Sequence, residues 1–355
     1  MPPVISLPVL PKTVRRPWCG LIVALLLLLV FESYLHTDAF LVRYRSVFAA
    51  GRALDKVRFA ETHCPSIIVL GNSRVDNGFD PRAIQHGLEL PDGREVFNLG
   101  VPGADSRVLG GILDRLDTAG CLRADRVGHL VLSLDEALVQ MIDTLGQDVF
   151  FINPSRMWTD GQYQDAFRAV LRLYGYSTNL RQLREPASLQ RFLAATTANI
   201  DPIGGGSALH LGYRAGWGGL QDREAAMRQD AGSLAPPDPV NLRQLWRMLD
   251  LLRSRGVHVV VVYPPLLNRD VLYLSANTSE GAPYRAIAAE LQRRGVPQIP
   301  LDAGAPRDPA EFVNAGHLND FGAQRYSRLL ANSLRQIWGD DLPQRRRNEL
   351  RPESP

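Results

Sequence analysis

The chain has 355 residues, of which 45% are hydrophobic and 22% are charged. This composition excludes an intrinsically disordered chain and suffices for at least one large core. The formal charge of +3 is raised by the arginines at 345–347. Because no nucleic-acid motif accompanies that charge, we expect no nucleic-acid partner.

The first predicted element is an apolar helix over residues 18–35, in which Glu32 is the only charged residue. Its length matches the thickness of a bilayer. A signal peptide would have a shorter apolar core and a small-residue cleavage site, so the sequence favours an uncleaved anchor. Lys12, Arg15 and Arg16 precede it, which predicts a cytoplasmic segment 1–17 and an extracytoplasmic remainder. A buried helix of the main domain is the alternative.

Residues 39–62 predict a helical stalk, and strands then alternate with helices up to residue 342. The strands are expected at 66–70, 95–98, 127–134, 257–263 and 296–301, and the helices at 81–88, 106–119, 241–255, 283–294 and 321–338. The strands are nearly continuous apolar runs, as in sheets covered on both faces. The alternation therefore predicts an α/β fold with a doubly wound, parallel, five-stranded sheet in a domain over 63–342.

Residues 136–240 interrupt this alternation and predict a helical insertion, with a flexible linker at Gly204-Gly205-Gly206. Such an insertion forms either a lid or substrate-binding wall, or a structural or partner-docking elaboration. The tail over 343–355 is expected to be disordered.

Cys64 and Cys121 each precede a predicted strand, whereas Cys19 lies in the anchor. In an oxidising compartment the first two either form a disulfide or remain two separate buried thiols.

Three sequence blocks carry the candidate chemistry. Gly71-Asn72-Ser73-Arg74 follows the first strand and places Ser73 at the carboxyl edge of the sheet, where open α/β sheets bind ligands. The block Asn98-Leu99-Gly100-Val101-Pro102-Gly103 offers backbone N–H groups of the kind that form an oxyanion hole. The loop 314–323 carries His317, a base able to take the serine proton near neutral pH.

These blocks, in this order, resemble the GDSL/SGNH hydrolase superfamily over residues 64–135 and 240–338. The run at 317–323, His-Leu-Asn-x-x-Gly-Ala, is similar to the terminal block of anchored bacterial members that act on cell-surface polymers. The resemblance implies a flavodoxin-like sheet in a periplasmic domain anchored to the bacterial inner membrane. It also implies Ser73 as nucleophile and first oxyanion donor, Gly100 as second donor and His317 as base, supported by Asn72, Arg74 and Asp135.

The chain departs from the family pattern at two positions. Asn314 stands where the family has the acid that orients the histidine, and Asp135 stands where a side-chain amide completes the oxyanion hole. An amide cannot stabilise an imidazolium as a carboxylate does. The site therefore works as a Ser-His dyad, or takes a carboxylate from Asp302, Asp308 or Glu311, or is weak or inactive.

We expect an O-acyltransferase or esterase, with acetyl as the acyl group, acting on an extracytoplasmic polysaccharide. A membrane-bound acyltransferase is the expected donor of the acyl group. The alternative is a non-catalytic accessory subunit of a polysaccharide acylation or synthesis complex. No Cys or His pair has metal-ligand spacing and no phosphate loop is present in the sequence, so we expect neither metal nor cofactor.

Overall fold

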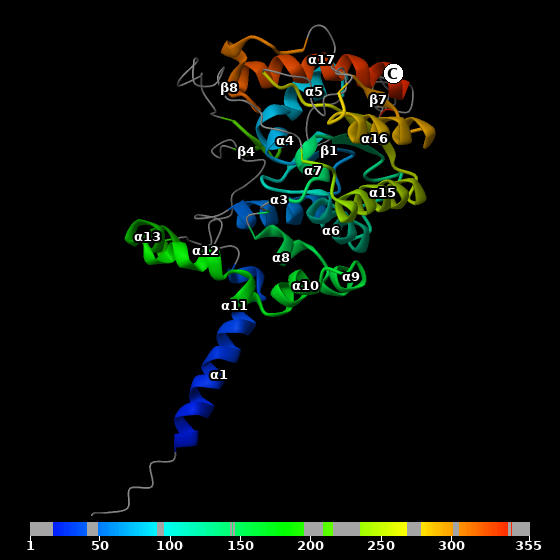
Figure 1. Cartoon of the computed structure of the whole chain (residues 1–355). Helices are drawn as coiled ribbons and strands as arrows, with labels where there is room; N and C mark the ends of the chain where they lie inside the picture. Colours follow the sequence, from blue (N-terminus) through cyan, green and yellow to red (C-terminus); the bar gives the residue numbers. More distant parts are fainter. Residues whose placement is uncertain are drawn as a thin grey trace, which may run out of the picture.

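The structure is a computed structural model that describes residues 17–40, 49–90, 96–142, 144, 146–194, 209–215, 235–267, 278–300, 305–339 and 342 (Figure 1). The predicted segment 1–17, except its last residue, the tail 343–355 and the glycine run at 204–206 lie outside these residues. The elements are α1 Pro17–Leu35, α3 Ala49–His63, β1 Ile67–Gly71, α4 Ser73–Gly78, α5 Pro81–Gly87, β2 Val96–Gly100, α6 Ser106–Thr118, β3 His129–Ser133, α7 Glu136–Val139, α8 Gln147–Phe151, α9 Pro154–Thr159, α10 Tyr163–Val170, α11 Arg172–Gly175, α12 Ser177–Arg181, η1 Gln182–Arg184, α13 Pro186–Ala194, β4 Leu209–His210, β5 Tyr213–Arg214, α15 Pro239–Ser254, β6 His258–Val262, α16 Ala282–Arg293, β7 Gln298–Ile299, η3 Pro309–Glu311, β8 Phe312–Asn314, β9 His317–Leu318 and α17 Asp320–Trp338.

The core of the protein is a five-stranded, all-parallel sheet in the order β2-β1-β3-β6-β7. Each strand falls at one of the five predicted apolar runs, so the predicted α/β class and parallel sheet are confirmed. β1 and β2 are in register from Ile67 opposite Val96 to Gly71 opposite Gly100. The two strands therefore end side by side at the carboxyl edge.

Helices cover both faces of the sheet. Ile68 and Leu70 of β1 point into a core with α3, α6 and α15. Ile67 and Val69 point to the opposite core, which contains α4, α5 and α17. All four side chains are fully buried, which explains the continuous apolar run of this strand.

Helix α1 is long and apolar enough to cross a membrane, and its side chains are largely exposed. It extends away from the rest of the molecule (Figure 1). The described part of residues 39–62 does not form the predicted stalk. Its described helical part is α3, and α3 packs against the sheet through buried residues such as Val57 and Ala60. Helix α3 therefore belongs to the core layer.

The insertion places α8 to α11 over α6 and α3, on the side of the domain from which α1 emerges (Figure 1). It also contains a hairpin, β4–β5, that was not predicted from the sequence. The hairpin turn carries Leu211 at φ +51° and Gly212 at φ +84°, and Leu211 O accepts a hydrogen bond from Asn98 N at 2.8 Å. Tyr213 Oη donates to Asp320 Oδ1 at 2.7 Å. One part of the insertion thus contacts β2 and the start of α17.

Cys64 and Cys121 form a disulfide, with their Cα atoms 5.1 Å apart. Of the two possibilities that the sequence left open, the structure has the cross-link. It joins the end of α3 to the segment between α6 and β3, at the amino edge of the sheet.

Candidate active site

Ser73 and His317 meet at the carboxyl edge of the sheet. Ser73 Oγ lies 2.8 Å from His317 Nε2, although the two residues are 244 positions apart in the chain. Gly71 makes the sharp exit from β1 possible, since a Cβ there would lie 2.4 Å from Val75 Cγ2. Asn72 caps α4 by accepting a hydrogen bond from Arg74 N at 2.9 Å. The predicted nucleophile and base are therefore within hydrogen-bond reach.

The ring of His317 is held by Asn314. His317 Nδ1 lies 3.0 Å from Asn314 Oδ1, and the same oxygen accepts from Gly316 N at 3.0 Å. Because the Gly316 contact identifies this amide atom as the oxygen, Nδ1 carries the proton and Nε2 is free to accept from the serine. The β8–β9 hairpin, predicted only as a loop, brings the two residues together.

The other carboxylates considered for this role are engaged elsewhere or not described. Asp308 caps η3 and accepts from Ala310 N at 2.9 Å. Glu311 is buried, pairs with Arg325 and accepts from Arg307 N at 3.2 Å. Asp302 lies outside the described residues. Of these candidates, Asn314 is the one that contacts the ring in the described part of the chain.

Burial of the ring, together with the positive charge of Arg74, lowers the pKa of His317 to about 4, and Asp76 opposes the change. The imidazole is therefore neutral at ordinary pH, as a general base must be. The same surroundings disfavour the imidazolium that forms when the base takes the serine proton.

Asp135 supports the turn that carries Ser73 through contacts with Asn72 and Arg74. It is fully buried, and its two oxygens each accept from Asn72 Nδ2 at 2.9 Å. It also pairs with Arg74 Nη1 at 3.0 Å, and Glu136 pairs with the same nitrogen at 2.9 Å. Burial raises the pKa of Asp135 and Arg74 opposes this. Asp135 therefore fixes the positions of Asn72 and Arg74 through contacts that commit both of its oxygens.

Arg74 is the cation of the site. Burial would lower its pKa, but Asp135 and Glu136 outweigh that effect and raise it. Its Nε and Nη2 lie toward the His317 hairpin, 3.8 Å from where a Cβ on Gly316 would stand. Glu136, which completes this ion pair, was not singled out in the sequence, because its pairing depends on the turn that follows β3.

Gly100 does not have the geometry expected of an oxyanion donor. Its N–H donates to Asn98 Oδ1 at 2.9 Å, and its carbonyl accepts from Lys56 Nζ at 2.7 Å. A Cβ there would lie 2.2 Å from Asp76 N, so the glycine is required for close packing of α4 on β2. The prediction that Gly100 is an oxyanion donor is therefore wrong, because its N–H already donates to Asn98.

Gly103 is the glycine whose backbone fits that role better. Ala104 N donates to Val101 O at 3.0 Å and Gly103 has φ +76°, which together describe a turn that favours glycine at this position. Gly103 N–H makes no hydrogen bond to the described part of the chain. Pro102 followed by Gly103 is the sequence signal that identifies such a turn.

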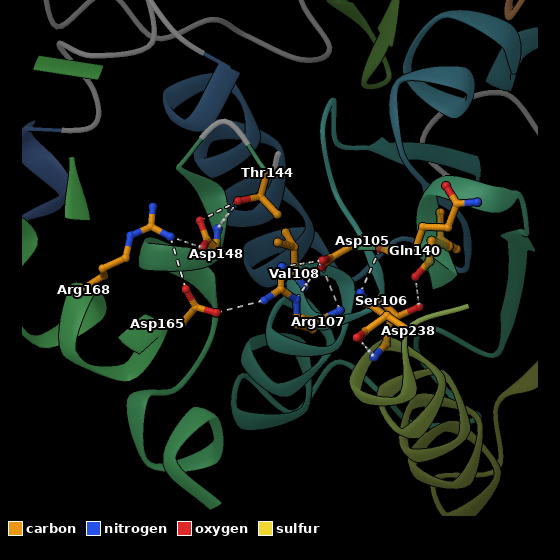
Figure 2. Close-up of polar contacts among 12 residues, drawn as sticks. Asp105, Ser106, Arg107, Val108, Gln140, Thr144, Asp148, Asp165, Arg168 and Asp238 are labelled. Carbon is orange, nitrogen blue, oxygen red and sulfur yellow. Dashed lines mark hydrogen bonds and ion pairs between the residues drawn. The ribbon is translucent and has the colours of Figure 1, made fainter. Parts of the chain in front are cut away.

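The loop that carries Gly103 is anchored by buried charges (Figure 2). Asp105 caps α6 by accepting from Arg107 N and Val108 N at 3.0 and 3.1 Å. Its carboxylate pairs with the Arg107 side chain at 2.7 Å, and Arg107 reaches Asp165 of α10 at 3.4 Å. Burial raises the pKa of Asp105, against the effect of Arg107. The insertion therefore stabilises the loop beside the site.

The chain matches no protein-family model, and no curated protein is significantly similar to it. Within the described ranges, no group of three or more His, Cys, Asp or Glu side chains is placed to hold a metal ion.

Proposed function

We propose that this protein catalyses serine-dependent acyl transfer or ester hydrolysis at the Ser73–His317 pair. The observation that carries the proposal is the chain of contacts from Ser73 Oγ to His317 Nε2 at 2.8 Å and from His317 Nδ1 to Asn314 Oδ1 at 3.0 Å. A base with one nitrogen on a nucleophile and the other on an orienting group is the arrangement that acyl transfer requires.

In the proposed reaction Ser73 Oγ attacks the acyl carbonyl carbon while its proton passes to His317 Nε2. His317 then returns the proton to the leaving alkoxide, and an acyl ester on Ser73 remains. An acceptor hydroxyl or water next gives its proton to His317, attacks the ester carbonyl and releases Ser73, which recovers the proton. The N–H groups of Ser73 and Gly103 would stabilise the oxyanion; neither makes a hydrogen bond within the described part of the chain.

The resemblance to the GDSL/SGNH superfamily supports this chemistry. The sheet order β2-β1-β3-β6-β7 corresponds to strands 2-1-3-4-5, the order of a flavodoxin-like sheet, in which ligands bind at the carboxyl edge beside the first and third strands. Ser73 follows the first strand of this sheet. We infer that the reaction adds an acetyl group to an extracytoplasmic polysaccharide or removes one from it.

The proposed location is the periplasmic side of a bacterial inner membrane, with α1 as a single-pass anchor. Two observations support it: the apolar length of α1 and the disulfide between Cys64 and Cys121, since disulfides persist outside the reducing cytosol. A membrane-bound acyltransferase would supply the acyl group to Ser73.

The test is hydrolysis of p-nitrophenyl acetate by the full chain in detergent. Ser73→Ala and His317→Ala are expected to abolish turnover, because each removes one end of the 2.8 Å contact. The matched controls are Ser254→Ala and His86→Ala, which remove an exposed serine and an exposed histidine on α15 and α5. If both site variants keep wild-type turnover, Ser73 is not the nucleophile. For an active wild-type chain, adding an acetyl-acceptor glycan distinguishes transfer from hydrolysis, because a transferase acetylates the glycan in preference to water.

The second candidate function is a non-catalytic accessory subunit of a polysaccharide acylation or synthesis complex. Asn314 favours it, because an amide on Nδ1 does not compensate the imidazolium charge. A folded wild-type chain without turnover, which still binds an acetylated polysaccharide, would favour this second function.

A further inference from the structure

The helical insertion exposes large apolar side chains close to the end of α1. We name these the aromatic patch. Its members are between 40% and 62% exposed: Trp158, Tyr163, Phe167, Val170, Leu171 and Tyr174. The rings of Trp158 and Tyr163 lie 4.8 Å apart, and those of Phe167 and Tyr174 lie 5.9 Å apart. The patch therefore crosses α9, α10 and α11 without a break.

Helix α10 buries its small side chains and exposes its large apolar ones, unlike an ordinary surface helix. Its alanines, Ala166 and Ala169, are each only 2% exposed, whereas Tyr163, Phe167 and Val170 face outward. These three stand at i, i+4 and i+7, on one stripe of the helix. In a helix that serves only the core, such a stripe would be buried. A contiguous exposed patch of this kind indicates a contact with something else.

Helix α11, which carries Tyr174 of the patch, is attached to the end of α1 by direct hydrogen bonds. The Glu32 carboxylate accepts from Arg172 N at 2.6 Å and from Leu173 N at 2.9 Å, which caps α11. Arg172 Nη1 also donates to Leu35 O at 3.2 Å. Helix α11 therefore lies where the apolar helix α1 ends, and α10 packs directly against α11.

A second apolar edge lies across α11 from α10. Helix α13 exposes Leu189 and Leu193, at 41% and 62%, one turn apart. In Figure 1, α12 and α13 extend to one side of α11, and α10 and α9 extend to the other. Apolar side chains thus flank the end of α1 in two directions, as a bilayer surface around an anchor requires.

We propose that the aromatic patch lies in the interfacial layer of the bilayer that α1 spans, in contact with lipid. This inference rests on the proposed membrane anchor. Lipid is the occupant because the patch is continuous with the end of the apolar span and combines Trp and Tyr with aliphatic side chains. Amphipathic rings of this kind collect at the level of lipid headgroups.

The orientation that follows sets the position of the active site. The patch lies beyond the helical layer of α3 and α6, whereas α4 and β8, which carry Ser73 and lead to His317, are on the far side of that layer from α9 to α11 (Figure 1). The Ser73–His317 pair is then held above the bilayer at a fixed orientation, open to substrates in the aqueous compartment.

The test uses the full chain in lipid nanodiscs whose phospholipids carry bromine on the upper acyl chain, which quenches tryptophan on contact. The signal of Trp158 is the difference between wild type and Trp158→Phe, and the signal of the anchor is the difference for Trp18→Phe. We expect both signals to lose most of their emission relative to discs without bromine. Phe167→Ser is expected to restore emission from Trp158. The matched control is Phe321→Ser, an exposed phenylalanine on α17, and should leave the quenching unchanged.

The outcomes separate the two proposals. Quenching of Trp18 without quenching of Trp158 overturns the patch inference and leaves the anchor standing. Absence of quenching at both positions overturns the anchor and the patch together. Turnover of p-nitrophenyl acetate by Ser73 is measured independently, so the failure of the acyl-transfer proposal is recognised by itself.

Discussion

Replacing Asn314 by Asp is expected to raise the pKa of His317. Asn314 Oδ1 lies 3.0 Å from Nδ1, and two unit charges about 3 Å apart attract by about 5 kcal/mol at an effective dielectric constant of about 20. Because this contact is only part-buried, water screens the attraction by roughly half. The net gain of about 2.5 kcal/mol raises the pKa by about 2. His317, which titrates at about 4 in the native chain, should then titrate near 6.

The measurement is a proton NMR titration of the imidazole ring, assigned by comparison with His317→Gln. The matched control is Asn153→Asp, which adds the same charge at the cap of α9 and can keep the hydrogen bond to Ser155 N. The p-nitrophenyl acetate assay follows in parallel. Stabilising the imidazolium should raise turnover at neutral pH by about 10- to 100-fold. A pKa for His317 that is the same in Asn314→Asp and Asn153→Asp would refute the reasoning.

The remaining predictions concern stability and are measured by urea unfolding of the full chain in detergent. Replacing Cys64 and Cys121 by Ser opens a cross-link with a sequence separation of 57 and should lower the free energy of unfolding by about 4 kcal/mol; an unchanged midpoint would contradict this. Lys56→Met leaves the carboxylate of Asp76, paired with Lys56 at 2.6 Å, buried without that cation, and should cost about 3 kcal/mol. Adding Asp76→Asn should recover part of that loss, whereas simple additivity of the two losses would count against the pairing. Gly100→Ala forces a Cβ to within 2.2 Å of the Asp76 backbone and should cost about 2 kcal/mol or more; a cost near zero would show that α4 is not packed as described.

The sequence predicts the sheet well because strands that helices cover on both faces have continuous apolar runs. It also predicts the pairing of Ser73 with His317 from the order of the three blocks. It does not predict the β8–β9 hairpin that brings His317 to the end of β1. The β8–β9 and β4–β5 hairpins have only two or three residues in each strand. Contacts such as Asn98 N with Leu211 O stabilise them, and no local pattern indicates those contacts.

The errors at the site have the same origin. Gly100 and Gly103 are alike in the sequence, and only the packing of α4 on β2 shows that the N–H of Gly100 is used by Asn98. Asp135, by contrast, supports the site as predicted, although its partners Asn72 and Arg74 come from a strand end 61 to 63 residues away in the chain. Long-range pairing of buried polar groups decided these roles.

The central claim is that His317 activates Ser73, and covalent labelling tests it most directly. The full chain is treated with a fluorophosphonate across a range of pH, and the modified residue is identified by mass spectrometry. We predict labelling of Ser73 that falls away below a pH of about 4, where the ring takes up a proton, and that is lost in His317→Ala. A folded chain that stays unlabelled at Ser73 at every pH, or is labelled equally in His317→Ala, would contradict the account.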